Sequence, residues 1–152
     1  MSSALLKHLQ QERAVLETFI ALLDREAEVL IKSRFEELPL ITERKAQLAE
    51  RITTLEQERE RRQQALGFGL GRVGGDLAAA AGGSELQQLW QELLTRAAQA
   101  RDNNHRNGIM IHTHLDFVRG SINFLRAHGQ SLYGADGQHK VGLGNGHSLA
   151  TG

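Results

Sequence analysis

Apolar side chains recur every three or four residues in three long stretches of the chain, which is the spacing of an amphipathic α-helix. The first stretch, about residues 3–33, repeats leucine every seven positions and adds further apolar residues on the same face: Leu9, Leu16, Leu23 and Leu30, with Phe19, Ile20, Ala27 and Ile31. Charged residues such as Glu12 occupy much of the remaining surface. This pattern predicts a helix that buries one side in a bundle or coiled coil.

A second helix is predicted over about residues 39–66. It opens at Pro39, which ends the first helical segment and is tolerated in a first helical turn. Its apolar row has the same seven-residue spacing (Ile41, Leu48 and Leu55, with Ile52 and Leu66 on the adjoining row). The segment 56–64, EQERERRQQ, contains no apolar residue. We therefore expect the distal half of this helix to face solvent or a partner.

A third helix is predicted over about residues 84–127, in two apolar parts. The first part is a patch of six residues (Leu86, Leu89, Trp90, Leu93, Leu94 and Ala97). The second is a regular row at spacings of three and four, here called the C-terminal stripe (Ile111, Leu115, Val118, Ile122 and Leu125). Between them lies the polar segment 101–108, RDNNHRNG. Because a row through Trp90, Ala97, Asn104 and Ile111 stays in register, we expect the helix to persist there.

Glycine marks the remaining organisation, because 14 of its 16 copies fall within residues 67–83 and 129–152. Glycine loses the most backbone entropy on folding, so these segments predict a loop and a flexible tail. Asp76 is a candidate cap for a short helix at about residues 76–81. The predicted fold is all-α: an elongated antiparallel bundle of three long helices over residues 1–128, with a short helix before the third and a glycine-rich tail at 129–152.

Composition and charge restrict the possible functions. Eighteen basic residues balance eighteen acidic ones, which disfavours nucleic acid as a partner. The absence of cysteine excludes disulfides and thiol chemistry. No apolar run approaches the roughly 20 residues of a membrane span or the length of a signal peptide. These features predict a cytoplasmic protein.

Two motifs that suggest chemistry have simpler explanations. Gly69, Gly71 and Gly74 match G-x-G-x-x-G, but a long helix precedes them where the dinucleotide fingerprint requires a strand. His112 and His114 lie two apart, so on a helix they point in different directions and cannot share one metal ion. No arrangement of nucleophile, base and orienting residue is recognisable. We predict no catalytic residues, no metal and no cofactor.

The layout of the chain resembles the FlgN family of flagellar export chaperones. Three short elements carry the resemblance: Leu38, Ile41 and Lys45 at the entry to the second helix, Asn104, Asn107 and Gly108 in the third, and Tyr133 and Gly137 in the tail. The resemblance covers nearly all of residues 1–137. The glycine-rich end beyond Gly137 matches no family pattern.

The resemblance implies a chaperone of hook-associated proteins, the subunits of the hook-filament junction. Such a chaperone covers amphipathic terminal segments, prevents premature assembly, and delivers the subunit to the export gate or export ATPase. The implied partner-binding residues are the C-terminal stripe with Leu132 and Tyr133 of the tail. Tyr133, the only tyrosine, is a candidate for docking at the gate. The alternative is a scaffolding protein that self-associates through its heptads.

Overall fold

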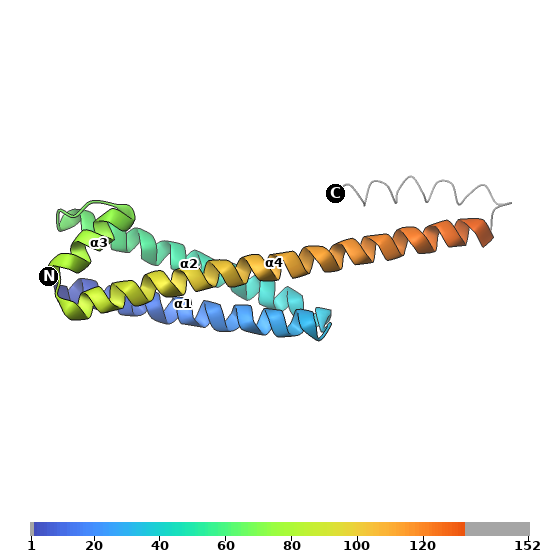
Figure 1. The fold of residues 1–152 in the computed structure, drawn as a ribbon, viewed down its shortest axis with the longest axis horizontal. Helices are drawn as coiled ribbons and strands as arrows, with labels where there is room; N and C mark the ends of the chain where they lie inside the picture. Colours follow the sequence, from blue (N-terminus) through green and yellow to red (C-terminus); the bar gives the residue numbers. More distant parts are fainter. Residues whose placement is uncertain (1, 133–152) are drawn as a thin grey trace. The chain divides into compact units, whose positions relative to one another are not determined.

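The computed structural model describes residues 2–132, and every secondary-structure element in that range is helical (Figure 1). The four α-helices are α1 (Ser2–Ile31), α2 (Leu38–Ala65), α3 (Gly71–Ala81) and α4 (Ser84–Leu132), and the 3₁₀ turn η1 (Phe35–Glu37) joins α1 to α2. The chain divides into two compact units, Met1–Asn107 and a second that starts at Gly108. The all-α prediction is confirmed. The predicted division between residues 128 and 129 stays a prediction, because residues 133–152 lie outside the described part.

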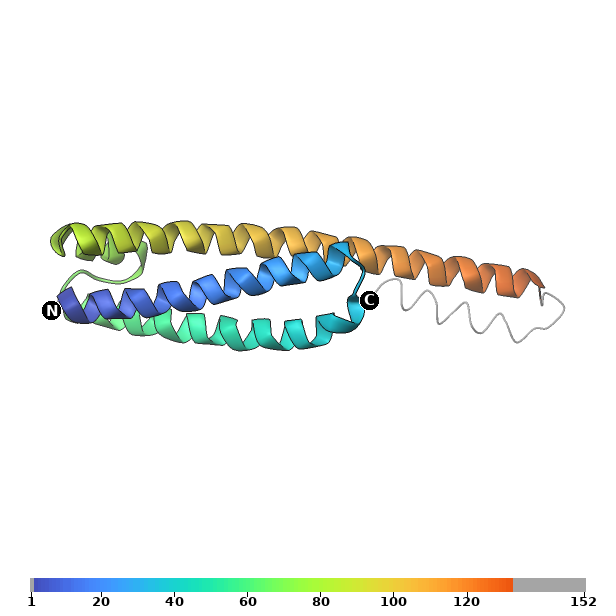
Figure 2. The same ribbon diagram turned by 90° about the horizontal axis from the view of Figure 1, so that it is seen from below.

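The first unit is a helical bundle in which α1 and α2 form a hairpin and run in opposite directions (Figure 2). Residues 84–107 of α4 lie beside α1 in both views. The core is made mainly of leucines from α1 and α4, and α3 contributes small residues (Leu5, Leu9, Leu16, Ile20, Leu23, Ala78, Ala79, Leu86, Leu89, Trp90, Leu93 and Ala100). Ile41, Leu48 and Leu55 of α2 are buried as well, so the apolar rows predicted for the three long helices form the core of this unit, with a few exceptions.

The exceptions show where helical periodicity alone was insufficient. Ile31 was predicted in the first stripe but is 74% exposed, because α1 ends there and the chain turns away. Ala97 and Asn104 were predicted on a continuous apolar row of α4, yet both are exposed. The buried row instead runs through the residues seven apart at Leu86, Leu93, Ala100 and Asn107. The helix nevertheless persists through residues 101–108, as predicted.

Several charged residues predicted at the surface are buried in the bundle. Glu12 of α1 is only 5% exposed, and both its carboxylate oxygens accept hydrogen bonds from Arg59 Nε of α2, at 2.9 and 3.1 Å. Arg59 also donates to Gln63 Oε1 at 2.8 Å, and Gln63 is buried. The expectation that segment 56–64 is wholly solvated or partner-facing is therefore wrong, since part of it packs inward through polar contacts.

Helix α3 is longer than predicted, beginning at Gly71 and not near residue 76. Asp76 does not cap it, because the N-cap position is Leu70 and Asp76 Oδ1 accepts a hydrogen bond from Trp90 Nε1 at 2.7 Å. Helix packing accounts for the glycine at position 75 of α3, because a Cβ there would overlap the Trp90 ring. Glycine here permits close helix packing and does not mark a loop. At the other end of the chain, α4 runs to Leu132, past the predicted end near residue 127.

The stability of the bundle should depend on pH through Glu12. Burial raises the pKa of the Glu12 carboxyl from 4.5 to about 7, although the Arg59 guanidinium opposes this change. Between these two values the folded chain holds more protons than the unfolded chain, so stability falls as pH rises from about 4.5 to about 7. Relative to Glu12→Gln, the natural chain should lose about 2 to 3 kcal/mol of unfolding free energy between pH 5 and pH 8. Urea unfolding of both proteins at the two pH values measures this difference, and parallel pH profiles would contradict it.

Candidate partner-binding face

The C-terminal stripe lies on α4 beyond Gly108, in the second unit. Its five residues come in the predicted order on one side of the helix, because spacings of three and four return to the same face every turn. Four of them are exposed: Leu115, Val118, Ile122 and Leu125, with Leu125 at 66%. Ile111 is partly buried. The structure thus brings these predicted residues together as one apolar surface that is largely open to solvent.

The C-terminal stripe differs from the equivalent row in the first unit. There, Leu86, Leu93 and Ala100 of the same helix are each less than a tenth exposed, because α1 and α3 supply the opposing side chains. Burying a leucine or isoleucine side chain is worth about 1.5 to 3 kcal/mol relative to leaving it exposed. A row of exposed aliphatic residues at helical spacing therefore offers a binding surface for another apolar helix face.

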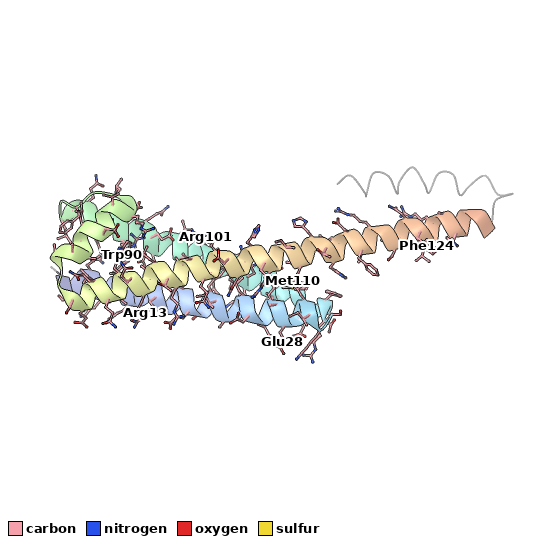
Figure 3. The ribbon with its side chains drawn as sticks, viewed as in Figure 1. Arg13, Glu28, Trp90, Arg101, Met110 and Phe124 are labelled. Atoms are coloured by element: carbon pink, nitrogen blue, oxygen red, sulfur yellow. The ribbon has the colours of Figure 1, made fainter. Side chains whose placement is uncertain are left out.

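Two exposed phenylalanines lie on an adjoining side of α4, about 120 to 140° around the helix axis from the middle of the C-terminal stripe. Phe117 is 72% exposed and Phe124, which is labelled in Figure 3, is 60% exposed. Because they lie seven apart in the sequence, they align along α4. The Phe124 ring contacts the His128 ring, with centroids 3.9 Å apart. Their seven-residue spacing was a signal available in the sequence. The aliphatic row does not reveal it, because the two rings lie on a different side of the helix.

A shallow hollow lies between the two phenylalanines. It is lined by Phe117, Gly120, Ser121, Phe124 and Leu125. Gly120 has open space around the position of a Cβ, so no group within the described chain fills the hollow. Aromatic projections that flank a glycine are suited to receiving a side chain from an opposing helix, as knobs fit into holes in coiled coils. We refer to the C-terminal stripe together with Phe117 and Phe124 as the apolar face.

The residues considered above for metal or nucleotide binding do not come together as such a site in the part of the chain that the structure describes. Within residues 2–132, no group of three or more histidine, aspartate or glutamate side chains is arranged to hold a metal ion. The glycine motif at Gly69, Gly71 and Gly74 follows helix α2 and not a strand. In the bundle, a small apolar cavity has Glu12 and Arg59 at its edge, but these two groups are hydrogen-bonded to each other.

Two predicted contact residues are not placed by the structure. Leu132 is the last residue of α4, and its side chain is not described. Tyr133, with the predicted tail beyond it, lies outside the described residues. Over the described range, no helix is long and apolar enough to cross a membrane.

The fold and the exposed residues together define a helical bundle protein whose last helix carries an exposed apolar surface. The chain belongs to the FlgN family, whose family model matches residues 1–140. It is 27% identical to the flagella synthesis protein FlgN of Yersinia enterocolitica (strain 8081) over 136 residues, 88% of this chain and 87% of the relative. It is also 27% identical to the flagella synthesis protein FlgN of Escherichia coli K12, over 86% of each chain. No solved structure matched the chain. Family membership supports a role as a chaperone in flagellar export.

Proposed function

We propose that this chain is a cytoplasmic flagellar export chaperone that binds the terminal helical segments of hook-associated proteins. The observation that carries the proposal is the exposed apolar face of α4, in particular Ile122 and Leu125 of the C-terminal stripe. An amphipathic terminal segment of a subunit is prone to premature assembly while its own apolar stripe is exposed. A helix that covers this stripe lowers that risk without any catalytic step.

The recognition is of the helix-against-helix kind. Aliphatic residues at spacings of three and four on α4 contact a complementary row on the partner. The bound subunit stays unassembled and is then delivered to the export gate or export ATPase. In this proposal Leu132 and Tyr133 continue the contact beyond the apolar face, and Tyr133 docks at the gate.

The proposal predicts that Ile122→Asp combined with Leu125→Asp abolishes binding of a hook-associated protein and leaves the fold intact. Two carboxylates buried in an apolar contact should weaken binding by about a hundredfold or more. Both side chains are exposed in the free protein, so each substitution should cost less than about 0.7 kcal/mol in helix propensity. Isothermal titration with a purified hook-associated protein measures binding, and circular dichroism measures helix content.

The first unit offers a matched control in Ile31→Asp combined with Leu40→Asp. These residues are also an exposed isoleucine and an exposed leucine, each 74% exposed, but they lie outside the apolar face. The control variant should bind like the natural chain. Equal affinity of all three proteins, or loss of helix content in the Ile122 and Leu125 variant, would contradict the proposal.

Self-association is the second candidate function, because an exposed row at spacings of three and four also suits pairing with a second copy. Sedimentation velocity at low concentration separates the two functions. A scaffold remains self-associated and forms no stoichiometric complex with a hook-associated protein, whereas a chaperone forms that complex.

A further inference from the structure

The charged residues of the second unit are unlike those of the bundle. Residues 108–132 contain two arginines, Arg119 and Arg126, and a single acidic residue, Asp116. In contrast, 15 of the chain's 18 acidic residues lie at or before Glu92. The part of α4 that carries the apolar face therefore has one more arginine than acidic residues, whereas the chain as a whole has no net charge.

Both arginines adjoin the C-terminal stripe on the same side. Arg119 follows Leu115 by four residues, and Arg126 follows Ile122 by four. Residues four apart are neighbours on a helix surface, and the two arginines are seven apart, so they align along one edge of the stripe. This is the placement that flanking charges have in paired helices, where they select partner and register.

The two guanidinium groups have no ion pair within residues 2–132, which includes Asp116 three positions before Arg119. Arg126 Nη1 is shielded from solvent and lacks a hydrogen-bond partner in that range. In the bundle, by comparison, Arg59 pairs with Glu12 at 2.9 Å, and Arg13 pairs with Glu92 at 2.6 Å. The stripe thus has a cationic edge that no carboxylate within residues 2–132 neutralises.

We infer that the segment bound by the apolar face is an amphipathic helix with aspartates or glutamates along one flank of its own apolar stripe. Carboxylates about seven residues apart would accept hydrogen bonds from Arg119 and Arg126 while the two apolar stripes pack together. The charges fix the register and orientation of the partner, and the apolar contact supplies most of the affinity. This inference rests on the proposed function and adds the chemistry of the partner.

The test uses two synthetic helical peptides with identical apolar stripes. One peptide carries glutamates on the flanking positions, and the other carries lysines at the same positions. Fluorescence anisotropy with the full chain should give about tenfold tighter binding of the glutamate peptide at about 0.05 M salt. This preference should shrink at about 0.5 M salt, because dissolved ions screen charge pairs at the rim of a contact.

Charge reversal shows whether these arginines cause the preference. Arg119→Glu combined with Arg126→Glu should favour the lysine peptide. The matched control is Arg44→Glu combined with Arg51→Glu, an exposed pair on α2 with the same seven-residue spacing and the same change of charge. The control variant should keep the preference of the natural chain for the glutamate peptide.

The outcomes separate this inference from the proposed function. Equal binding of the two peptides to the natural chain, or an equal effect of both charge reversals, would show that the partner needs no acidic flank. The proposed apolar contact would be unaffected by that result. If neither peptide binds the natural chain, the apolar face does not recognise amphipathic helices, and the proposed function fails as well.

Discussion

Replacing Trp90 with alanine is expected to lower the free energy of unfolding by about 3 to 5 kcal/mol. Trp90 is buried where α3 meets α4 (Figure 3), and its Nε1 donates to Asp76 Oδ1 at 2.7 Å. Its ring lies beneath the Arg59 guanidinium, with Cζ 5.0 Å from the ring centroid, and closely approaches Gly75. The substitution therefore removes a large apolar contact between α3 and α4 and leaves a cavity. Urea unfolding followed by circular dichroism measures the loss.

Two milder variants show which contact of Trp90 accounts for the loss of unfolding free energy. Trp90→Phe retains most of the ring but loses the Nε1 donor, so it should cost about 1 to 2 kcal/mol. Gly75→Ala would favour the helical backbone by about 1 kcal/mol on an exposed surface, but here the added Cβ overlaps the Trp90 ring. Gly75→Ala should therefore destabilise the fold. A stabilising Gly75→Ala variant, or a Trp90→Ala variant within about 1 kcal/mol of the natural chain, would show that α3 is not held through this ring.

The three long helices could be predicted because their apolar periodicity and their burial agree. Leu9, Leu16 and Leu23 are spaced seven apart in the sequence, and all three are buried against the other helices. Where a helix ends, periodicity continues but burial does not, as the exposed Ile31 shows. The positions of the helices were therefore predictable from local pattern. The limits of the buried surface were not, because they depend on which elements pack together.

The glycine-rich segment illustrates a tertiary contact that local propensity could not reveal. Glycine disfavours helix, so residues 71–75 were read as loop, yet they form the first turns of α3. A Cβ at Gly74 would overlap the carbonyl of Gly69, and one at Gly75 would overlap Trp90. The glycines are needed for these close approaches. Only the arrangement of α2, α3 and α4 shows this requirement.

The polar residues of the bundle were misread for a related reason. Glu12 and Gln63 were placed at the surface because polar residues usually lie there. In the structure they lie inside because Arg59 donates to both, and Gln63 also donates to the carbonyls of Gly69 and Gly71. Asn107, in the polar segment before the C-terminal stripe, takes the position of a core residue in the row of Leu86 and Leu93. Such pairings are set by distances between helices, which a single sequence does not contain.

The residue spacing predicts which side chains of the candidate site share a helix face, but it does not predict that this face is exposed to solvent. The spacing from Ile111 to Leu125 resembles that of a core helix, and nothing in this spacing distinguishes a buried row from an exposed one. The structure supplies the exposure of Leu115 and Leu125, and it adds the two phenylalanines. The assignment of Tyr133 and the tail still rests on the resemblance to the family.

Replacing Lys45 with methionine is expected to lower the free energy of unfolding by about 3 to 5 kcal/mol. Lys45 Nζ lies 3.0 and 3.2 Å from the two carboxylate oxygens of Glu26, whose side chain is only 1% exposed. Asn107 Nδ2 donates to the same carboxylate at 3.0 Å and to the Leu23 carbonyl at 2.7 Å, so the network joins α1, α2 and α4. Without the ammonium group, the Glu26 carboxylate is buried with a single neutral donor. The free-energy cost of removing that charge from water is then no longer offset by the ion pair with Lys45.

A double-mutant cycle separates the ion pair from the packing of the methylene groups. Glu26→Gln alone should lower the free energy of unfolding by less than Lys45→Met does. The reason is that Lys45 is 20% exposed, so its ammonium can reach water. The double variant Lys45→Met with Glu26→Gln buries no unpaired charge, so it should recover all but about 1 kcal/mol of the stability of the natural chain. Urea unfolding of the four proteins gives the coupling energy. If the double variant is as unstable as the sum of the single variants, the two side chains act independently, and Asn107 rather than Lys45 is the partner that makes the buried carboxylate tolerable.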